Sequence, residues 1–349
     1  RQLKTILLPH NYLNFVLTGA IHMEYGDASG TGLMDIRQRA WHKEVLQAID
    51  SHLEQKLPPL THPLYPIGYV AGPIKNDFNL DKVLVSAGGG DNMMAAIGTG
   101  NTKANLATLS LGTSGTIFAY APRPIIDSRG EIAAFCDSTG GWLPLLCTMN
   151  VTNTTEKIKQ LLNLSNQDLE KLAALAPPGS EGLMFLPFLD GERVPEIPLA
   201  TGAFIGLTQR TFSLPYLVRA VLEGTIFNLG YGWARMKQLK INPSEIRVTG
   251  GGAKNKTWLK IAASILNCPL FTLAENEAAA YGAALQSIWT YLYEQGEKVP
   301  IQELTENLVK KSSSPVEPEP GLTSLYSELQ KKFNLTWQSI PWESLQAIE

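Results

Sequence analysis

The chain has 349 residues, of which 44% are hydrophobic and 17% charged, and its formal net charge is −3. This composition is typical of a globular protein with room for two domains, and it lacks the positive surface that nucleic acid binding requires. Because no stretch reaches the roughly 20 consecutive apolar residues of a membrane span, we expect neither a nucleic acid nor a membrane partner.

The first part of the chain predicts short elements separated by polar and proline-rich loops. Pro9 and Gly19 bound one helix, and the helical spacing of apolar residues from Trp41 to Ile49 indicates another. In order, the predicted elements are helices over 9–18 and about 41–53, a proline-rich connection over 55–80, a strand over 83–87, a glycine turn at 88–90, and a helix from Asp91 to about Gly98. A polar segment follows, and we place the domain boundary in it, between residues 104 and 105.

The second part predicts longer elements. In order, these are a hairpin over 108–120, an apolar segment at 142–147, helices over about 153–163, 167–174 and 214–238, a strand at 246–250, a helix over 255–267, a strand at 270–273, a helix over 277–294, a loop at 312–320, and an amphipathic helix that carries Leu322, Leu325, Leu329 and Phe333. The unit of strand, glycine turn and helix occurs in both parts, which predicts two related α/β lobes. The cysteines Cys136, Cys147 and Cys268 lie far apart in apolar surroundings, which predicts reduced thiols in a cytoplasmic protein.

Three glycine-rich turns are the strongest functional signal. They are Gly88–Gly90 after a strand, Gly112–Gly115 at the hairpin tip, and Gly250–Gly252 after another strand. Glycine lets a backbone approach a phosphate closely and adopt positive φ, and a helix that begins behind the turn adds unpaired N–H donors. A single cluster of this kind could simply mark a turn, but three in one chain favour a nucleotide-phosphate site.

Asp91 is the candidate catalytic residue. It follows three glycines at the carboxyl end of a predicted strand, where open α/β sheets place their ligands. An ionised carboxylate there could accept a hydroxyl proton as a general base, and the next residue, Asn92, would contact the same substrate. The alternative is that Asp91 only caps the following helix.

The other turns predict nucleotide contacts. Gly112, Thr113 and Ser114 offer hydroxyl and N–H groups suited to the β- and γ-phosphates. The turn at 250–253 has neither the Lys-Ser/Thr ending of a Walker loop nor the spacing of a dinucleotide fingerprint. On the long helix, Glu223 and Asn228 favour core or surface polar roles. Neither the histidines nor the cysteines have metal-ligand spacing, so the metal ligands stay undetermined.

Several ordered motifs resemble the FGGY family of carbohydrate kinases. They are Ser86-Ala87-Gly88-Gly89-Gly90-Asp91-Asn92, Ser110-Leu111-Gly112-Thr113-Ser114-Gly115, Phe185-Leu186-Pro187-Phe188-Leu189-Asp190-Gly191-Glu192-Arg193, and Gly250-Gly251-Gly252-Ala253 with Ala280-Tyr281-Gly282-Ala283-Ala284. The stretch from Gly202 to Glu223 is similar to the family's C-terminal signature, although Tyr216 stands where a polar residue is usual. The resemblance covers nearly the whole chain.

This resemblance implies an α/β fold of two actin-like, ribonuclease-H-type lobes around a cleft. Residues 1–104 would be the latter part of the first, sugar-side lobe, and residues 105–349 the second, nucleotide-side lobe. It also implies that the chain starts after the family's first phosphate loop, so that the first lobe is incomplete at its N-terminus. We therefore expect this chain alone to be inactive.

The implied activity is transfer of the γ-phosphate of MgATP to a sugar hydroxyl, with D-xylulose as the first candidate sugar and Asp91 as the base. Adenine and ribose would lie against Gly251, Gly252, Ala253 and Asn255, with Asn228 nearby. A homodimer is left open. The alternatives are a kinase of another ketose or polyol, an actin- or chaperone-like ATPase that acts on protein partners, and a catalytically inactive binding fragment.

Overall fold

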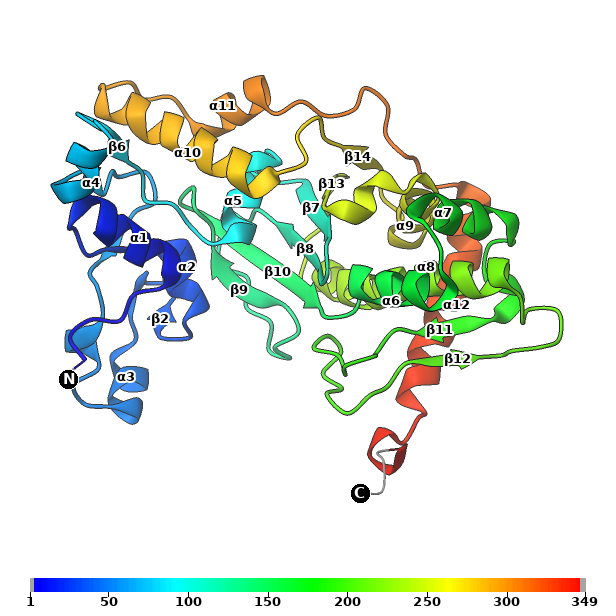
Figure 1. Ribbon diagram of the computed structural model, residues 1–349. Helices are drawn as coiled ribbons and strands as arrows, with labels where there is room; N and C mark the ends of the chain where they lie inside the picture. Colours follow the sequence, from blue (N-terminus) through cyan, green and yellow to red (C-terminus); the bar gives the residue numbers. More distant parts are fainter. Residues whose placement is uncertain (1–2, 346–349) are drawn as a thin grey trace.

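A six-stranded mixed sheet forms the centre of the second part of the chain in the computed structural model, which describes residues 3–345 (Figure 1). Its strands are β7 (Leu106–Leu111), β8 (Gly115–Ala119), β9 (Ala133–Cys136), β10 (Trp142–Thr148), β13 (Glu245–Thr249) and β14 (Leu270–Thr272). Their spatial order is β14-β13-β7-β8-β10-β9, with β7, β8, β10 and β9 antiparallel and β13 and β14 parallel to β7. This is the strand arrangement expected of a ribonuclease-H-type lobe.

The register of β7 against β13 brings two glycine turns together. Ser110 pairs with Thr249, so the two parallel strands end at the same edge of the sheet. The hairpin tip that follows β7 and the turn that follows β13 therefore lie side by side. At this contact a Cβ on Gly250 would lie 2.7 Å from the carbonyl oxygen of Leu111, and Gly250 also has a φ of +87°, so only glycine fits.

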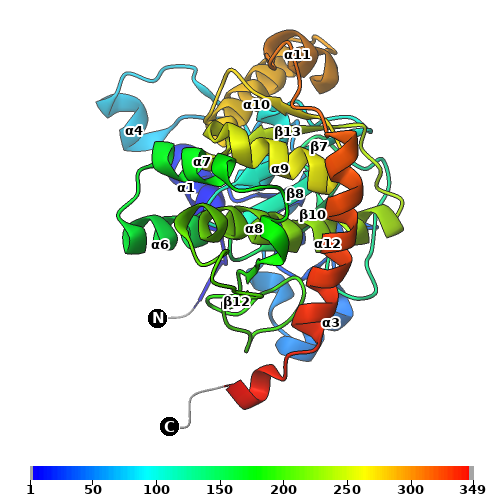
Figure 2. The same cartoon turned by 90° about the vertical axis from the view of Figure 1, so that its right-hand side faces the viewer.

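Helices cover both faces of the sheet. One face packs against α8 (Leu214–Gln238) and α9 (Lys256–Leu266) through a large apolar core, with α6 (Thr152–Leu162) and α7 (Asn166–Leu175) beside them. The other face packs against α5 (Asp91–Gly98), α10 (Ala278–Glu294) and α11 (Ile301–Leu308). The last helix, α12 (Pro320–Gln338), crosses over α8 and α9 and does not contact the sheet face directly (Figure 2).

The part of the chain before α5 contains only short elements. Its helices are α1 (Pro9–Thr18), α2 (Tyr25–Gly30), α3 (Lys43–Ile49) and α4 (Gly72–Asp77), and its strands form the pairs β1 (Met23–Glu24) with β4 (Leu60–Thr61), β2 (Met34–Asp35) with β3 (Ala40–Trp41), and β5 (Gly68–Tyr69) with β6 (Leu84–Val85). Within residues 3–345, no helix has the length and apolar character that crossing a membrane requires.

Two predictions in this part are wrong in extent. The helix expected over 41–53 spans only α3, because Trp41 belongs to β3 and its indole N–H donates to the carbonyl of Pro58 at 2.9 Å. Ile49, expected on the apolar face, is 63% exposed. The strand expected over 83–87 spans only Leu84–Val85, because it pairs with the two-residue β5 alone.

The helices α5 and α10 cross at unusually close range because both carry glycine at the crossing. A Cβ on Gly98 would lie 1.9 Å from the carbonyl oxygen of Ala278, and a Cβ on Gly282 would lie 1.7 Å from that of Met94. No side chain of any size fits at these distances. The backbones therefore touch directly, and α5 is fixed against α10 along its length.

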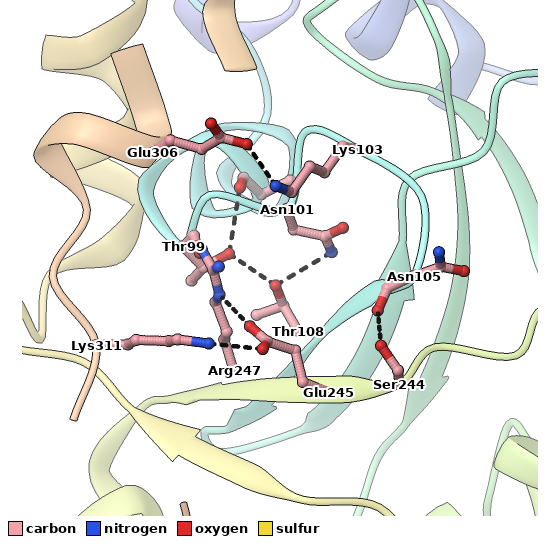
Figure 3. A network of polar contacts seen from close by, with 11 residues as sticks. Thr99, Asn101, Lys103, Asn105, Thr108, Ser244, Glu245, Arg247, Glu306 and Lys311 are labelled. Carbon is pink, nitrogen blue, oxygen red and sulfur yellow. Dashed lines mark hydrogen bonds and ion pairs between the residues drawn. The ribbon is translucent and has the colours of Figure 1, made fainter. Parts of the chain in front are cut away.

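Polar contacts also fix residues 99–105, which connect α5 to β7 (Figure 3). The hydroxyls of Thr99 and Thr108 lie 2.7 Å apart, and Asn101 Nδ2 donates to Thr108 Oγ1 at 3.2 Å. Arg247, on β13, donates from Nη1 to the carbonyl of Thr99 at 2.5 Å. The junction between the two parts of the chain is thus a bonded segment of the structure rather than a loose linker.

The crossing predicts that Gly282→Ala is strongly destabilising. Alanine normally favours a helix interior over glycine by about 1 kcal/mol, but here its methyl group would force α5 and α10 apart. We expect the free energy of unfolding in urea to fall by about 3 kcal/mol. The matched control is Gly321→Ala on α12, where no atom lies within 4 Å of the added methyl group. Equal stability of Gly282→Ala and the wild type would contradict the direct backbone contact between α5 and α10.

Candidate functional site

Two cavities meet at the turn between β13 and α9. The first, here the Asp91 cavity, has a volume of about 290 Å³; the second, here the Trp258 cavity, has a volume of about 360 Å³. The Asp91 cavity is lined by residues that include Asp91, Asn92, Ser110, Thr249, Gly250, Glu277 and Ala278, and the Trp258 cavity by residues that include Thr152, Thr155, Glu170, Gly252, Asn255 and Trp258. Gly251 and Lys254 line both.

The turn itself is built to leave its outer side open. After Gly250 the chain forms a short 3₁₀ helix over Gly251–Lys254, and Asn255 then caps α9 by accepting the N–H of Trp258 at 2.9 Å. A Cβ on Gly251 would meet no atom within 4 Å. The cavities therefore meet over a bare stretch of backbone, next to the N-terminal end of α9 and its positive dipole.

Asp91 is the first residue of α5, and its carboxylate is exposed at the Asp91 cavity. The cap of α5 is Gly90, not Asp91, so the alternative of a simple capping role for Asp91 is wrong. The carboxylate accepts the N–H and the side-chain amide of Asn92 at 2.8 and 3.1 Å. Among residues 3–345, no lysine or arginine forms an ion pair with Asp91, which leaves the carboxylate available to a substrate.

Asn92 ties this helix terminus to the hairpin. Its Oδ1 accepts the hydroxyl of Thr116, on β8, at 3.3 Å. The residue opposite Thr116 on the next strand is Cys147, whose Sγ receives Arg193 Nη1 at 3.4 Å. The guanidinium of Arg193 therefore lies over the face of the sheet that α5 covers, close to the site.

The turn Gly88–Gly90 is glycine-rich for a different reason from the one the sequence suggested. It packs on a polar floor, defined here as the side chains of His10, Glu24, Asp27 and Ser138. A Cβ on Gly89 would lie 2.7 Å from Ser138 Oγ, and a Cβ on Gly90 would lie 2.9 Å from Asp27 Oδ1. Sequence reasoning missed this floor because its members lie up to about 80 residues from the turn, with no local pattern to mark them.

Glu24 is the most perturbed group of the floor. Its carboxylate is buried and accepts the N–H groups of Gly26 and Asp27, both at 2.6 Å, which caps α2. Burial raises the pKa of Glu24 to about 7, and the two N–H groups oppose part of that rise. Beside it, burial lowers the pKa of His10, but the ion pair with Asp27 at 2.5 Å outweighs this and the pKa of His10 is raised.

The predicted phosphate-binding tip lies next to the Asp91 cavity. The carbonyl of Gly112 accepts the N–H of Thr152 at 3.0 Å, which joins the tip to the start of α6. The side chains of Thr113 and Ser114 are exposed. Ser110, just before the tip, lines the Asp91 cavity. Thr113 and Ser114 line neither cavity, so their role as phosphate ligands remains a prediction.

Two of the predicted nucleotide contacts, Asn228 and Ala253, line neither cavity. Asn228 is fully buried in α8, and its Nδ2 donates to Glu192 Oε2 at 2.8 Å. This bond gives Asn228 the core polar role that the sequence also favoured. Ala253 packs its methyl group against the core. Glu223 has the expected core role, because it pairs with Arg219 at 2.7 Å inside the lobe.

Comparison with known proteins gives consistent family matches. Residues 107–291 match the model of the C-terminal domain of the FGGY family of carbohydrate kinases, and residues 1–98 match the model of its N-terminal domain. The chain is 43% identical over 290 residues to a xylulose kinase of Haemophilus influenzae and 34% identical over 288 residues to one of Escherichia coli. These alignments cover 82% and 81% of this chain, and the chain spans 59% of the length of each relative.

Solved structures agree in fold. A xylulose kinase structure from Brucella ovis superposes with a TM-score of 0.88 at 27% identity, covering 96% of this chain and 68% of the other. A glycerol kinase structure from Plasmodium falciparum, with ADP, has a TM-score of 0.81 at 18% identity and covers 99% of this chain and 67% of the other. At that identity the second likeness shows the fold alone.

The buried Glu24 predicts a pH-dependent stability difference. Because the folded-state pKa is raised from 4.5 to about 7, the folded chain keeps a proton that the unfolded chain releases, and its stability falls as the pH rises between these values. Between about pH 5 and about pH 8, the wild type should lose up to about 3 kcal/mol of unfolding free energy relative to Glu24→Gln. Urea unfolding of both proteins measures this; a difference that stays constant with pH would contradict it.

Proposed function

Because the chain belongs to the FGGY family of carbohydrate kinases, we propose that it carries the catalytic base and the nucleotide site of an ATP-dependent sugar kinase. The reaction is phosphorylation of a sugar hydroxyl, with D-xylulose as the substrate and D-xylulose 5-phosphate as the product. The observation that carries this proposal is the exposed Asp91 carboxylate at a cavity that continues, over Gly251 and Lys254, into a second cavity.

The nucleotide occupies both cavities in this proposal. Adenine and ribose lie in the Trp258 cavity, against Gly252 and Asn255, and the phosphates cross Gly251 toward Asp91. The bare backbone at Gly251, the ammonium group of Lys254 and the N-terminal end of α9 suit a polyanion. The hairpin tip at Gly112–Ser114 borders the same edge of the sheet and adds donors for the terminal phosphates.

Magnesium enters with the nucleotide in this proposal. Among residues 3–345 no group of three or more histidine, cysteine or acidic side chains could hold a metal ion. Asp91 and Glu277 are the carboxylates that line the Asp91 cavity. With Asp91 serving as the base, Glu277 is the carboxylate left for Mg²⁺, which is commonly bound by one or two carboxylates together with substrate phosphates and water.

Asp91 accepts the proton of the sugar hydroxyl as its oxygen attacks the γ-phosphorus. The new O–P bond forms while the bond between the γ-phosphorus and the bridging oxygen of ADP breaks, and ADP leaves. Positioning and charge neutralisation supply most of the acceleration in such transfers. Residues 1–104 form part of the sugar-side lobe and residues 105–349 the nucleotide-side lobe.

The names of the relatives reported above support D-xylulose over other sugars, since both are xylulose kinases. The competing assignments are a kinase of another ketose or polyol and an ATPase that acts on protein partners. A coupled assay of ADP release by the full-length protein that contains this chain separates them. Release that depends on D-xylulose supports the proposal, release that depends only on another sugar changes the substrate, and sugar-independent release favours the ATPase.

The assignment of Asp91 predicts that, in the full-length protein, Asp91→Asn lowers kcat for sugar phosphorylation by roughly 10²–10⁴-fold, because the amide cannot accept the hydroxyl proton. ATP affinity should stay unchanged, since the nucleotide is held by the β13–α9 turn. Steady-state kinetics and ATP titration measure the two effects. Asp81→Asn, at an exposed ion pair with Lys75, is the control. Retention of more than about a tenth of wild-type turnover would remove Asp91 from the mechanism.

The nucleotide placement predicts a selective effect of Gly251→Val. The added side chain would enter open space between the two cavities without a clash, so the fold should persist while the phosphates are displaced. We expect the KM for ATP to rise about tenfold, equivalent to ~1.4 kcal/mol, with little change in the KM for sugar. Gly252 is a poorer site for this test because a Cβ there would lie 2.8 Å from the Trp258 ring. Equal effects on both substrates would contradict the placement.

A further inference from the structure

A buried glutamine holds the turn that presents Asp91. Gln286 lies on α10 with no exposed surface. Its Oε1 accepts the N–H of Gly88 at 2.9 Å, and its Nε2 donates to the carbonyl of Gly88 at 3.0 Å. The side-chain amide thus pairs with both backbone groups of one residue, 198 positions earlier in the chain.

Gly88 has an unusual backbone conformation for its partner to hold. It stands three residues before Asp91 with a φ of +72°, outside any regular element, and a Cβ on it would lie 3.2 Å from the His10 ring. Its two hydrogen bonds are partly buried, and backbone groups that lose contact with water cost free energy unless they are bonded. Only a side chain with one donor and one acceptor in a fixed arrangement satisfies an N–H and a C=O of the same residue, and a primary amide has this pattern.

The same helix holds α5 at three successive levels. Gln286 bonds Gly88, Gly282 touches the backbone of Met94, and Ala278 touches Gly98. The first turn of α10, at Ala278 and Ala279, also lines the Asp91 cavity. The N-terminal end of α10 therefore borders the proposed phosphate site, and Gln286, further along the same helix, bonds the turn that precedes Asp91.

We propose that Gln286 is a positioning residue for Asp91: its amide fixes the Gly88 backbone and so sets where the base stands relative to the nucleotide phosphates. This inference rests on the proposed function. The pair of hydrogen bonds acts through the backbone from Gly88 to Asp91 and touches no substrate. Without these two hydrogen bonds the nucleotide site stays intact, but the Asp91 carboxylate is displaced from the position in which it can accept the proton of the sugar hydroxyl.

Kinetics of Gln286→Met test the proposal, because methionine keeps the volume of glutamine but removes both hydrogen bonds. We expect kcat to fall about 10- to 100-fold, the cost of misplacing a reacting group by about 1 Å, with the KM for ATP unchanged. The matched control is Thr290→Val, one turn further along α10, where the buried hydroxyl has no hydrogen-bond partner in the described structure. An unchanged kcat, or an equal loss in the control, overturns the proposal.

Gln286→Glu gives a signature that a purely structural role would not produce. An ionised carboxylate can only accept, whereas a protonated carboxyl offers one donor and one acceptor, as the amide does. The ratio of variant to wild-type kcat should therefore rise as the pH falls. The titratable side chains closest to this turn are those of His10, Glu24 and Asp27. They are common to both proteins, so the ratio removes most of their effect on kcat. A ratio that does not change with pH overturns the proposal.

Amide hydrogen exchange tests the two hydrogen bonds between Gln286 and Gly88 without any assay of activity. In the wild type the N–H of Gly88 should exchange slowly, and in Gln286→Met at least about tenfold faster, while amides in α9 stay unchanged. Equal exchange rates of the Gly88 N–H in both proteins overturn the proposal that Gln286 holds this turn. If the full-length protein that contains this chain releases no ADP with any sugar, the proposed function fails, whereas the exchange result still decides whether Gln286 holds the turn.

Discussion

The position of Asp91 depends on the direct contact between the backbones of α5 and α10. Glycine at Gly98 and Gly282 removes the side chains that would keep these helices apart. Helix axes usually lie 8–10 Å apart because side chains fill the space between them. Since α10 also packs on the sheet through Leu285 and Trp289, the contact fixes α5, the catalytic candidate at its start, and the sheet as one unit.

Glycine serves three different purposes in this chain, although its clusters look alike in the sequence. At Gly88–Gly90 it allows the backbone to rest on the side chains of the polar floor. At Gly250 it allows positive φ and close approach to Leu111. At Gly251 the missing side chain leaves open space where the Asp91 and Trp258 cavities meet. Of these glycines, Gly251 is therefore the one whose missing side chain leaves room for a ligand.

Three buried glutamates hold backbone segments in place. Glu24 accepts two N–H groups at the start of α2, Glu192 accepts the N–H groups of Met149 and Arg193, and Glu223 accepts the N–H of Gly179. Burying a carboxylate is costly unless it is bonded. Glu24 is bonded locally, within the start of α2, whereas Glu192 and Glu223 also bond backbone 43 and 44 residues away, at Met149 and Gly179. Moving either of those segments would remove one donor from a buried carboxylate.

The sequence by itself determined the second lobe in detail. Its long helix α8 begins and ends where predicted, as does α5 before the lobe boundary. The hairpin and the β13–α9 unit were predicted from apolar runs bounded by glycine, proline and capping residues. These signals are local, and long elements with regular periodicity carry them clearly. Asp91 and the three glycines that line the cavities, Gly250, Gly251 and Gly252, were singled out for the same reason, because each lies in a recognisable turn after a strand.

Only the tertiary structure decided the rest. The elements before α5 are so short that contacts such as Trp41 with Pro58 override their local pattern. Asn228, predicted near the nucleotide, is instead bonded to Glu192. The polar floor and Gln286 act on Gly88–Gly90 from positions distant in the chain. No local spacing signals such a contact, because it exists only once the sheet has brought α10, α1 and β9 around the same turn.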